Sequence, residues 1–422
     1  MKKVLVMMEP LFLILALGSL LSCFPTPGPT SLEDIAARAL PYQHTTEKDS
    51  VVESVNAFSL GLYAQLASAD DENIFFSPFS ISSALAMAYA GAKGDTARQM
   101  AATLGFTLAQ DAIPAAFGAL LGDMNAVGAL NAYELDTANS LWGQQDLPFL
   151  DDFLSVVKNS YGAPLQRVDF VTQTEQARIA INDWVSGRTH GKILDLLQQG
   201  SIDANTRLVL ANAIYFKGAW ARTFKEADTS NQPFQLANGS TATVLMMNQK
   251  AEFNYMENDL LKMLELPYTT GDLSMLFILP NYGRTLAEVE SALNSSAFKL
   301  WTSQLNKVEE LEVGIPRFSF AASFRLAEQL GKMGMTDAFE PASADFSGMT
   351  GSTGLSIGDV FHKAFVLVNE EGTEAAAATA VTVGVTAMGP SFTADHPFLF
   401  LIRHNLSGAI LFFGRVMDPR SD

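Results

Sequence analysis

Hydrophobic residues in the first part of the chain are spaced as they are in helices. In residues 52–67 they recur every three or four positions, on one face of an α-helix, at Val52, Val55, Phe58, Leu62 and Leu66. Ser77 followed by Pro78 predicts the start of a second helix, because serine caps helix starts and proline is tolerated at the first helical position. Residues 80–92 are small and apolar on every side, so this second helix should be buried.

Uninterrupted apolar runs in the later part of the chain predict buried strands. Residues 208–216 and 273–279 are such runs. Residues 398–402 and 409–413 form another two, joined by a polar segment, 403–408, that contains the Asn and Gly of a hairpin turn. Helices come first and strands dominate the second half, which indicates an α+β class with large, mainly antiparallel sheets.

Composition narrows the range of partners. The 422 residues are 48% hydrophobic, which is enough for a substantial core and too apolar for a disordered chain. There are 27 Lys and Arg against 45 Asp and Glu, so the surface should repel phosphate backbones, and no nucleic-acid partner is expected. A single cysteine excludes an internal disulfide framework and a cysteine-based zinc site.

The N-terminus has the pattern of an export signal. A positive start, Met1-Lys2-Lys3, precedes an apolar run, 11–21, that is too short for a comfortable membrane span. We expect residues 1–22 to be a signal peptide. The lone Cys23 after a small residue resembles a bacterial lipobox, which would make it a lipidated N-terminus, and the alternative is an ordinary cleaved signal. The protein is expected to be exported, either as a cell-envelope lipoprotein (outer membrane, cell surface or periplasm) or as an extracellular protein.

Prolines mark the segment that follows the signal. Residues 23–48 carry Pro25, Pro27, Pro29 and Pro41 with little hydrophobic periodicity, which is typical of a tether. Residues 49–420 contain no further linker, repeat or long charge run, and we expect them to form one mixed domain. Membrane contact is expected only through the N-terminal lipid.

Common catalytic motifs are missing from the sequence. It contains no Gly-x-Ser-x-Gly elbow, no His-Glu-x-x-His motif and no phosphate-binding Gly-rich loop. The five histidines do not fall at metal-ligand spacing. We therefore expect a protein that is not an enzyme and that has no metal or other cofactor.

Four separated stretches span nearly the whole domain. They are residues 73–82 (NIFFSPFSIS), 182–185 with 191–193 (NDWV and GKI), 210–220 (LANAIYFKGAW), and 362–377 with 395–398 and 414–416 (HKAFVLVNEEGTEAAA, DHPF and GRV). In this order and at these intervals, they resemble the serpin family of serine protease inhibitors. The resemblance implies a bacterial serpin with about nine helices on three mainly antiparallel sheets and an exposed reactive-centre loop at about 371–394. A protease that attacks this loop would be trapped as an acyl-enzyme when the cut loop inserts into the central sheet.

The resemblance also assigns residues within the loop. The hinge would be Gly372, Thr373, Glu374, Ala375, Ala376 and Ala377. Family spacing from Gly372 and from Pro397 places the attacked bond at Thr386–Ala387, with Val385–Thr386 and Met388–Gly389 left open. The small residues around this bond favour elastase-like or subtilisin-like proteases as targets.

Insertion as a strand would place alternate loop residues on opposite faces. One set, Thr373, Ala375, Ala377, Thr379, Val381 and Val383, carries no charge and suits burial, whereas the only charge, Glu374, falls in the other set. The alternative is a short exposed helix, because residues 374–378 have helical composition. In that case the protein would be a non-inhibitory binding or structural module with a serpin fold on the cell envelope.

Two further groups of residues follow from the resemblance. Ser77, Ser80, Asn212 and His362 would form a buried hydrogen-bonded network where the central sheet parts, which we call the shutter. Trp220, Arg317 and Glu370 would lie where the loop first inserts, which we call the breach. The expected partner is a target serine protease in a covalent complex. The working state should be a monomer that is prone to loop–sheet polymerisation, because a sheet that accepts its own loop can accept that of another molecule.

Overall fold

The computed structural model describes residues 42–128, 133–373 and 389–420. Ten α-helices lie in these ranges, close to the nine expected, with 3₁₀ turns at Glu226–Asp228 and Asp337–Phe339. The helices are α2 (Thr46–Ala67), α3 (Pro78–Tyr89), α4 (Gly94–Leu104), α5 (Ile113–Gly128), α6 (Asp151–Tyr161), α7 (Thr174–Arg188), α8 (Leu286–Ala292), α9 (Ser295–Ser303), α10 (Ala327–Lys332) and α11 (Ser347–Thr350). None of the helices in these ranges is long and apolar enough to cross a bilayer.

The two helices predicted near the start of the domain are both present. Helix α2 begins at Thr46, earlier than the periodic segment, because the Thr45 hydroxyl accepts a hydrogen bond from the Lys48 backbone and caps the helix. The ordered domain therefore starts before residue 49, within the segment predicted as a tether. Helix α3 has Ser77 as its cap and is buried along its whole length, as expected.

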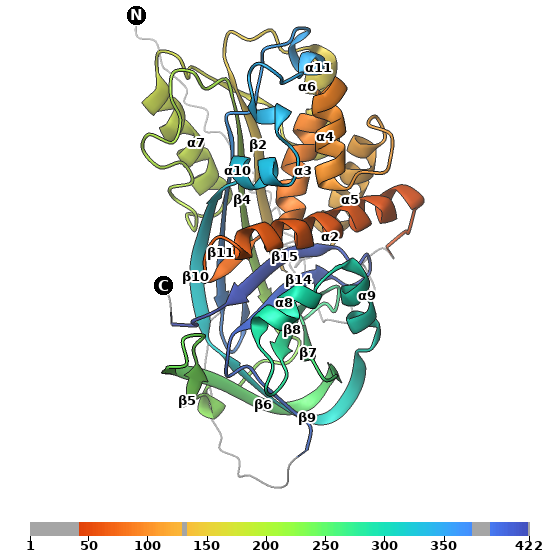
Figure 1. The fold of residues 1–422 in the computed structure, drawn as a ribbon, viewed down its shortest axis with the longest axis vertical. Coiled ribbons are helices and arrows are strands. Elements are labelled where there is room, and N and C mark those ends of the chain that lie inside the picture. Colours follow the sequence, from red (N-terminus) through yellow and green to blue (C-terminus); the bar gives the residue numbers. More distant parts are fainter. Residues whose placement is uncertain (1–41, 129–132, 374–388, 421–422) are drawn as a thin grey trace, which may run out of the picture.

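The smaller sheet has six strands in the order β10-β11-β12-β4-β2-β3, and it is the long sheet beside α7 in Figure 1. Its strands are β10 (Phe318–Arg325), β11 (Asp359–Val368), β12 (Gly372–Thr373), β4 (Leu208–Ala219), β2 (Glu134–Gln144) and β3 (Gln166–Val168). Strands β11 and β4 pair directly and in parallel over residues 359–364 and 209–214. At one end they are separated by the two-residue strand β12, which is antiparallel to both.

The larger sheet has nine strands. They are β1 (Ile74–Phe76), β15 (Ile410–Val416), β14 (Phe398–His404), β8 (Leu273–Pro280), β7 (Leu261–Pro267), β6 (Thr241–Glu257), β9 (Asn306–Pro316) and β13 (Ser391–Thr393) in that order, with β5 (Ser230–Gln235) beside β6. The predicted hairpin is β14–β15. Three sheets were expected, but hydrogen bonds join the strands of the described ranges into two. One half of the long strand β6 pairs with β5 and the other half with β7, with a register shift against β9 between Ala251 and Phe253.

Both faces of the six-stranded sheet are covered. Along β4, Leu208, Leu210, Ile214 and Phe216 belong to the main hydrophobic core. The alternating residues Val209, Ala211 and Ala213 belong to a second core, together with Ile181 and Val185 of α7. Helix α7 lies on the opposite side of the sheet from α3 (Figure 1). Any strand added beside β4 must therefore present a buried side chain to each face.

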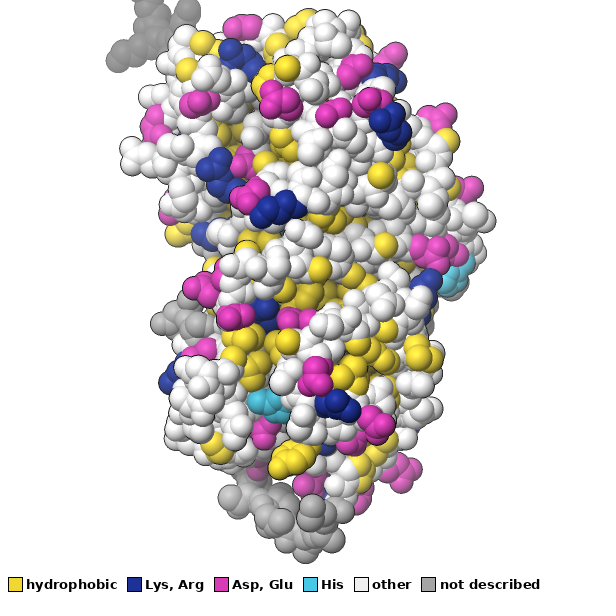
Figure 2. Space-filling model, viewed as in Figure 1, with side chains coloured by type: hydrophobic (Ala, Val, Ile, Leu, Met, Phe, Trp, Pro, Cys, Tyr) yellow, Lys and Arg dark blue, Asp and Glu magenta, His cyan; other side chains and the backbone are white. Residues whose placement is uncertain are grey.

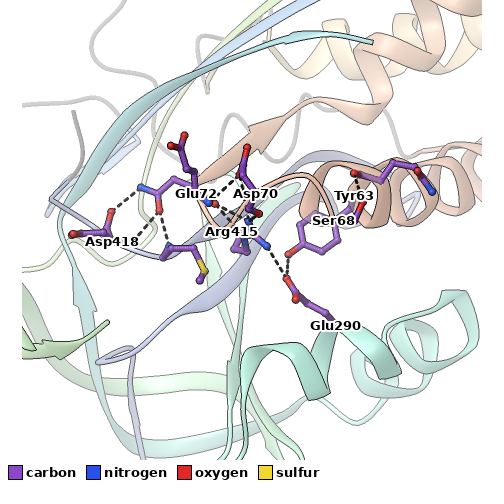
Figure 3. A network of polar contacts seen from close by, with 10 residues as sticks. Tyr63, Ser68, Asp70, Glu72, Glu290, Arg415 and Asp418 are labelled. Atoms are coloured by element: carbon purple, nitrogen blue, oxygen red, sulfur yellow. Dashed lines mark hydrogen bonds and ion pairs between the residues drawn. The ribbon is translucent and has the colours of Figure 1, made fainter. Parts of the chain in front are cut away.

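A buried arginine ties the C-terminal strand β15 to the turn that follows α2 (Figure 3). The Arg415 guanidinium donates to the Asp70 carbonyl at 2.7 Å and to the Glu72 carbonyl at 2.9 Å, and lies 3.4 Å from the Glu290 carboxylate. The Tyr63 hydroxyl donates to the same carboxylate. These bonds compensate the buried charge and fix the end of the chain against α2 and α8.

The described surface carries charges of both signs. On the face shown in Figure 2, Lys and Arg side chains lie singly or in small groups among Asp and Glu. The chain as a whole has a formal net charge of −18. The face in view thus offers no extended basic area for a polyanion.

Candidate functional site

Insertion of the hinge into the six-stranded sheet has already begun in this structure. Thr373 pairs with Val368 of β11 on one side and with Gly218 of β4 on the other, and Gly372 pairs with Ala219. Thr373 is only 2% exposed. Gly372 and Thr373 were expected in an exposed loop. They form β12 because the turn at residues 369–372 folds the chain straight back between its neighbours.

Only glycine fits at position 372. A Cβ atom there would lie 2.1 Å from the Gly218 carbonyl oxygen and 2.7 Å from the Ala219 Cα, which are rigid backbone atoms of β4. Gly372 also has a φ of +157°, which side-chain-bearing residues rarely adopt. The missing side chain is therefore what allows the hinge to approach β4.

Gly372→Ala should consequently expel β12 from the sheet. We expect the backbone amide of Thr373 to exchange with deuterium faster by about tenfold or more, because the pairing of β12 with β11 and β4 would open locally. Hydrogen exchange followed by mass spectrometry of the peptide that contains residues 366–373 measures this. Gly331→Ala is the matched control, since a Cβ at that position meets no atom within 4 Å. Unchanged exchange in Gly372→Ala would contradict the role assigned to this glycine.

Thr373 lies against an aromatic pair in the breach. Its hydroxyl is 2.9 Å from the hydroxyl of Tyr268, a fully buried tyrosine whose pKa is raised by burial. The Tyr268 ring stacks on Trp220 at 4.7 Å between centroids. The sequence analysis missed Tyr268, because it stands just after a strand with no motif to mark it. Trp220, which the sequence analysis did predict as a breach residue, is the ring on which Tyr268 stacks.

The ion pair of the breach is also present. Arg317 donates through Nε to Glu370 at 2.8 Å, and the Thr229 hydroxyl donates to the same carboxylate. Burial alone would raise the pKa of Glu370, but the bonds from Arg317 and Thr229 outweigh it and hold the pKa below its usual value. The Trp220 indole donates to the Asn369 carbonyl at 3.0 Å. Together these contacts fix the segment from which β12 starts.

The four predicted shutter residues lie together and are fully buried. The Ser77 backbone N–H donates to Nε2 of His362 at 3.1 Å, so the ring proton is on Nδ1, where it is donated to the Asn212 side-chain oxygen. The Asn212 amide donates to Ser80 Oγ at 2.8 Å, and Ser77 Oγ donates to the Leu411 carbonyl at 2.6 Å. This network joins helix α3 to β4 and β11 across the line where those strands pair.

Asn139 of β2 is a fifth member that the sequence analysis did not find. Its side-chain oxygen accepts from Ser80 Oγ at 2.8 Å and from the Asn212 amide, and its own amide donates to the Ser80 carbonyl. The signal that predicts it is its register, since it faces Asn212 across the β2–β4 ladder. With Asn139 included, each polar group of the shutter has a partner, as a buried network requires.

His362 makes the shutter sensitive to acid. Burial lowers the pKa of His362 from 6.5 to about 3, so the ring is neutral in the closed sheet at physiological pH. A chain in which this ring reaches water takes up a proton below pH 6.5. The contribution of His362 to native stability is therefore complete above about pH 6.5 and is lost as the pH falls towards 3, at no more than about 1.4 kcal/mol per pH unit.

We expect the rate of polymerisation at a fixed temperature to rise between pH 7 and pH 5, and native gels after timed incubation measure it. His404 is also buried, and burial lowers its pKa to about 4. His404→Gln is thus the appropriate comparison, and it should keep most of the acid response if His362 is responsible. If His404→Gln abolished the acid response, His404 and not His362 would be responsible for it.

Several predicted residues lie outside the described ranges. They are Cys23, hinge residues Glu374, Ala375, Ala376 and Ala377, and the bond Thr386–Ala387. The far end of the loop is described as strand β13, in which Phe392 is buried and residues 391–393 pair in parallel with β9. Within the described ranges no three His, Cys, Asp or Glu side chains lie close enough to hold a metal ion.

Comparison with known proteins agrees with this geometry. Residues 53–419 match the family model described as serpin (serine protease inhibitor). The chain is 46% identical to a leukocyte elastase inhibitor of Xenopus laevis over 354 residues, which cover 82% of this chain and 93% of the relative. It is 44% identical to the human leukocyte elastase inhibitor over 372 residues, which cover 86% and 97%.

A solved structure extends the agreement to the fold. Human thyroxine-binding globulin, determined as a complex with thyroxine, superposes with a TM-score of 0.81 at 32% identity, covering 89% of this chain and all of the other. The two elastase inhibitors come from vertebrates and give no support to a bacterial origin. They are inhibitors, in line with the expectation that this protein is not an enzyme. The chain belongs to the serpin family of serine protease inhibitors.

Proposed function

We propose that this protein is a suicide inhibitor that traps serine proteases by inserting its cleaved reactive-centre loop between β11 and β4. The observation that carries the proposal is strand β12, whose two residues already separate these strands at one end. The rest of the β11–β4 interface is a ladder of six residue pairs that insertion would have to open. The protease would remain attached as an acyl-enzyme, so the inhibitor needs no catalytic residue of its own.

The register of β12 specifies where each inserted residue would go. Thr373 faces Val368 and Gly218, so each later residue would face the preceding residue on both neighbouring strands. Continued by six residues, this register brings Thr379 between His362 and Asn212, which pair with each other in the closed sheet. The Thr379 hydroxyl would then lie where the His362–Asn212 hydrogen bond is broken, and it can compensate for that loss.

The same register explains the small residues of the loop. Odd-numbered residues from Thr373 to Val383 would face the main core, beside Phe216, Ile214, Asn212 and Leu210 of β4. The even-numbered set was expected to tolerate charge. That holds for Glu374, which would lie beside the half-exposed Lys217, but Ala378 and Ala380 would lie beside Ala213 and Ala211 in the second core under α7. Both faces therefore require small side chains further along the loop.

Insertion has a driving force in the strand pairing. The closed sheet joins β11 to β4 by a parallel ladder, and β12 is antiparallel to both. Continued insertion would replace one parallel ladder with two antiparallel ones, which adds hydrogen bonds of the slightly more stable kind. This supports a native state that is held by the shutter rather than by the lowest free energy.

The proposed targets are elastase-like or subtilisin-like proteases. Support comes from the small residues around Thr386–Ala387 and from relatives named as leukocyte elastase inhibitors. The test is to mix the protein with pancreatic elastase and, separately, with subtilisin, and to run a denaturing gel. A covalent complex of summed mass, with the cleaved bond read by mass spectrometry, is the expected result for at least one enzyme. Cleavage of the loop by both without any complex would contradict inhibition.

The second candidate function is a serpin-fold binding module without trapping. The observation that favours it is the likeness to thyroxine-binding globulin, whose structure was solved with a bound small molecule. The gel described above separates the two functions, because a module of this kind would be cut without forming a complex. In either case we propose a monomer as the working state, with polymers forming when the shutter opens.

We further propose that the chain is exported and that a lipid on Cys23 anchors it to the cell envelope. Support comes from the N-terminal sequence alone, with its positive start, apolar run and lone cysteine. Expression of the full chain in a bacterial host with labelled palmitate tests lipidation. Label that is incorporated and then lost in Cys23→Ser is expected, and an unlabelled secreted protein would contradict the anchor.

A further inference from the structure

The first described residue of the chain packs against one side of the domain. The Tyr42 ring meets the His404 ring edge-on at 5.6 Å between centroids, and the Lys48 ammonium lies 4.3 Å from the centroid of the Tyr42 ring. His404 is the last residue of β14, so Tyr42 lies beside the turn that joins β14 to β15. The stretch of chain from Cys23 to Tyr42 spans at most about 65 Å when fully extended. A lipid on Cys23 would therefore keep this side of the domain within reach of the bilayer.

Two half-exposed leucines lie beside the first half of α2 on the same side. Leu406, in the β14–β15 turn, is 47% exposed, and Leu300, on α9, is 55% exposed. Asn56 of α2 donates a hydrogen bond to a carbonyl of that turn at 2.9 Å, and Glu53, about one turn earlier in α2, accepts one from Lys299 of α9 at 2.8 Å. The turn and α9 thus contact the same part of α2, and Figure 2 shows hydrophobic side chains gathered around α8 and α9. The two leucines belong to one surface.

The charges on this side are largely compensated. The chain as a whole carries a formal net charge of −18, which an anionic lipid surface repels. Beside the first half of α2, however, Glu53 is paired with Lys299, and Asp123 of α5 is paired with Lys48 at 2.7 Å. This side can therefore approach a bilayer at a lower electrostatic cost than the molecule as a whole.

From these observations we infer that the surface formed by Leu300, Leu406 and the first half of α2, which we call the docking face, rests on the bilayer that carries the lipid anchor. The leucines would enter the boundary between headgroups and acyl chains, as the apolar side of an interfacial protein does. Two leucines alone bind a bilayer weakly, but a tethered domain meets it at a high effective concentration. The inference rests on the proposed anchor at Cys23 and is independent of protease inhibition.

Docking in this way leaves the inhibitory machinery free. Helix α7, which covers the outer face of the six-stranded sheet, lies on the opposite side of the molecule from α9 (Figure 1). Opening of the β11–β4 ladder would therefore not require the docking face to leave the bilayer. The bilayer would set the orientation of the domain rather than its state.

Hydrogen exchange on a chemically anchored chain tests the docking face. The chain from Cys23 onwards is coupled through this thiol, its single cysteine, to a maleimide lipid in vesicles of phosphatidylethanolamine and phosphatidylglycerol. Relative to the uncoupled chain, peptides that cover residues 296–303 and 404–408 should exchange about fivefold more slowly or less, because docking opposes the local opening that exchange requires. A peptide that covers residues 350–354, next to α11, should be unchanged.

Paired variants separate the docking face from general stickiness. Leu300→Ser with Leu406→Ser should abolish the protection of both peptides. Leu194→Ser with Leu245→Ser is the matched control, because these leucines are 58% and 44% exposed on other parts of the surface, and it should keep the protection. Protection that survives in the first double variant would overturn the docking face. Equal protection of residues 350–354 in the unmodified chain, or no protection of any peptide, would overturn it as well.

The outcomes distinguish this inference from the proposals on which the rest of the account depends. Unlabelled Cys23 in the palmitate experiment would overturn the anchor in cells, whereas the coupled chain measures the affinity of the face for a bilayer separately. Failure to trap any protease would overturn the proposed inhibition and leave the exchange result unaffected.

Discussion

Thr373→Arg is expected to turn the protein from an inhibitor into a substrate. Thr373 is 2% exposed between β11 and β4, and its hydroxyl contacts that of Tyr268, so an arginine would have to bury its charge within the sheet. A penalty of about 3 kcal/mol for the unpaired charge slows insertion more than a hundredfold. Deacylation would then be faster than insertion. Denaturing gels with a protease that the unmodified protein traps should show cleaved protein in place of the complex.

Thr373→Val is the matched control for this prediction. Valine has nearly the same volume as threonine and carries no charge, so insertion should proceed, and only the bond to Tyr268 is lost. The yield of complex should remain close to that of the unmodified protein. An unchanged yield with Thr373→Arg would contradict the burial of this residue during trapping.

His362→Ala is expected to have the largest effect on the stability of the closed sheet. It leaves the Ser77 N–H and the Asn212 side-chain oxygen without the imidazole and opens a cavity beside Phe324. Each unsatisfied buried group costs about 1–3 kcal/mol and the lost ring adds more, so the native state should lose at least about 3 kcal/mol. The protein should polymerise at temperatures where the unmodified chain stays monomeric.

Native gels after a temperature series, with calorimetric melting in parallel, measure the effect of His362→Ala. His44→Ala provides the control, because the His44 side chain is 61% exposed and contacts Asp49 only at the surface. It should behave as the unmodified protein does. If His362→Ala polymerised only at the temperature at which the unmodified protein does, the shutter would not be what holds the sheet closed.

Local patterns in the sequence were sufficient for much of the fold. The cap at Ser77, the buried helix after it and the hairpin at the C-terminus depend on neighbouring residues, and all are present. The number of sheets could not be predicted from local patterns, because it depends on how the single strand β6 is shared between β5 and β7. Such sharing is a tertiary property that leaves no periodic signal.

The functional site likewise contains residues that the sequence predicts and residues that only the tertiary structure reveals. Motif resemblance found Ser77, Ser80, Asn212 and His362, which the structure joins in one network. It missed Asn139 and Tyr268, since each acquires its role only through a partner distant in the chain. It also treated Thr373 as part of an exposed loop, because the depth to which a hinge is inserted depends on the backbone approach to Gly218 rather than on composition.

The most direct test of the account is to lock the closed sheet with a disulfide between β4 and β11. Ala213→Cys with Lys363→Cys joins residues that pair across this line, in a background where Cys23 is replaced by serine. The oxidised protein should be cleaved without forming a complex, and dithiothreitol should restore trapping. Ala138→Cys with Ala213→Cys bridges β2 and β4, which move together, and should trap in both states. A complex formed by the oxidised 213–363 variant would contradict insertion between β11 and β4.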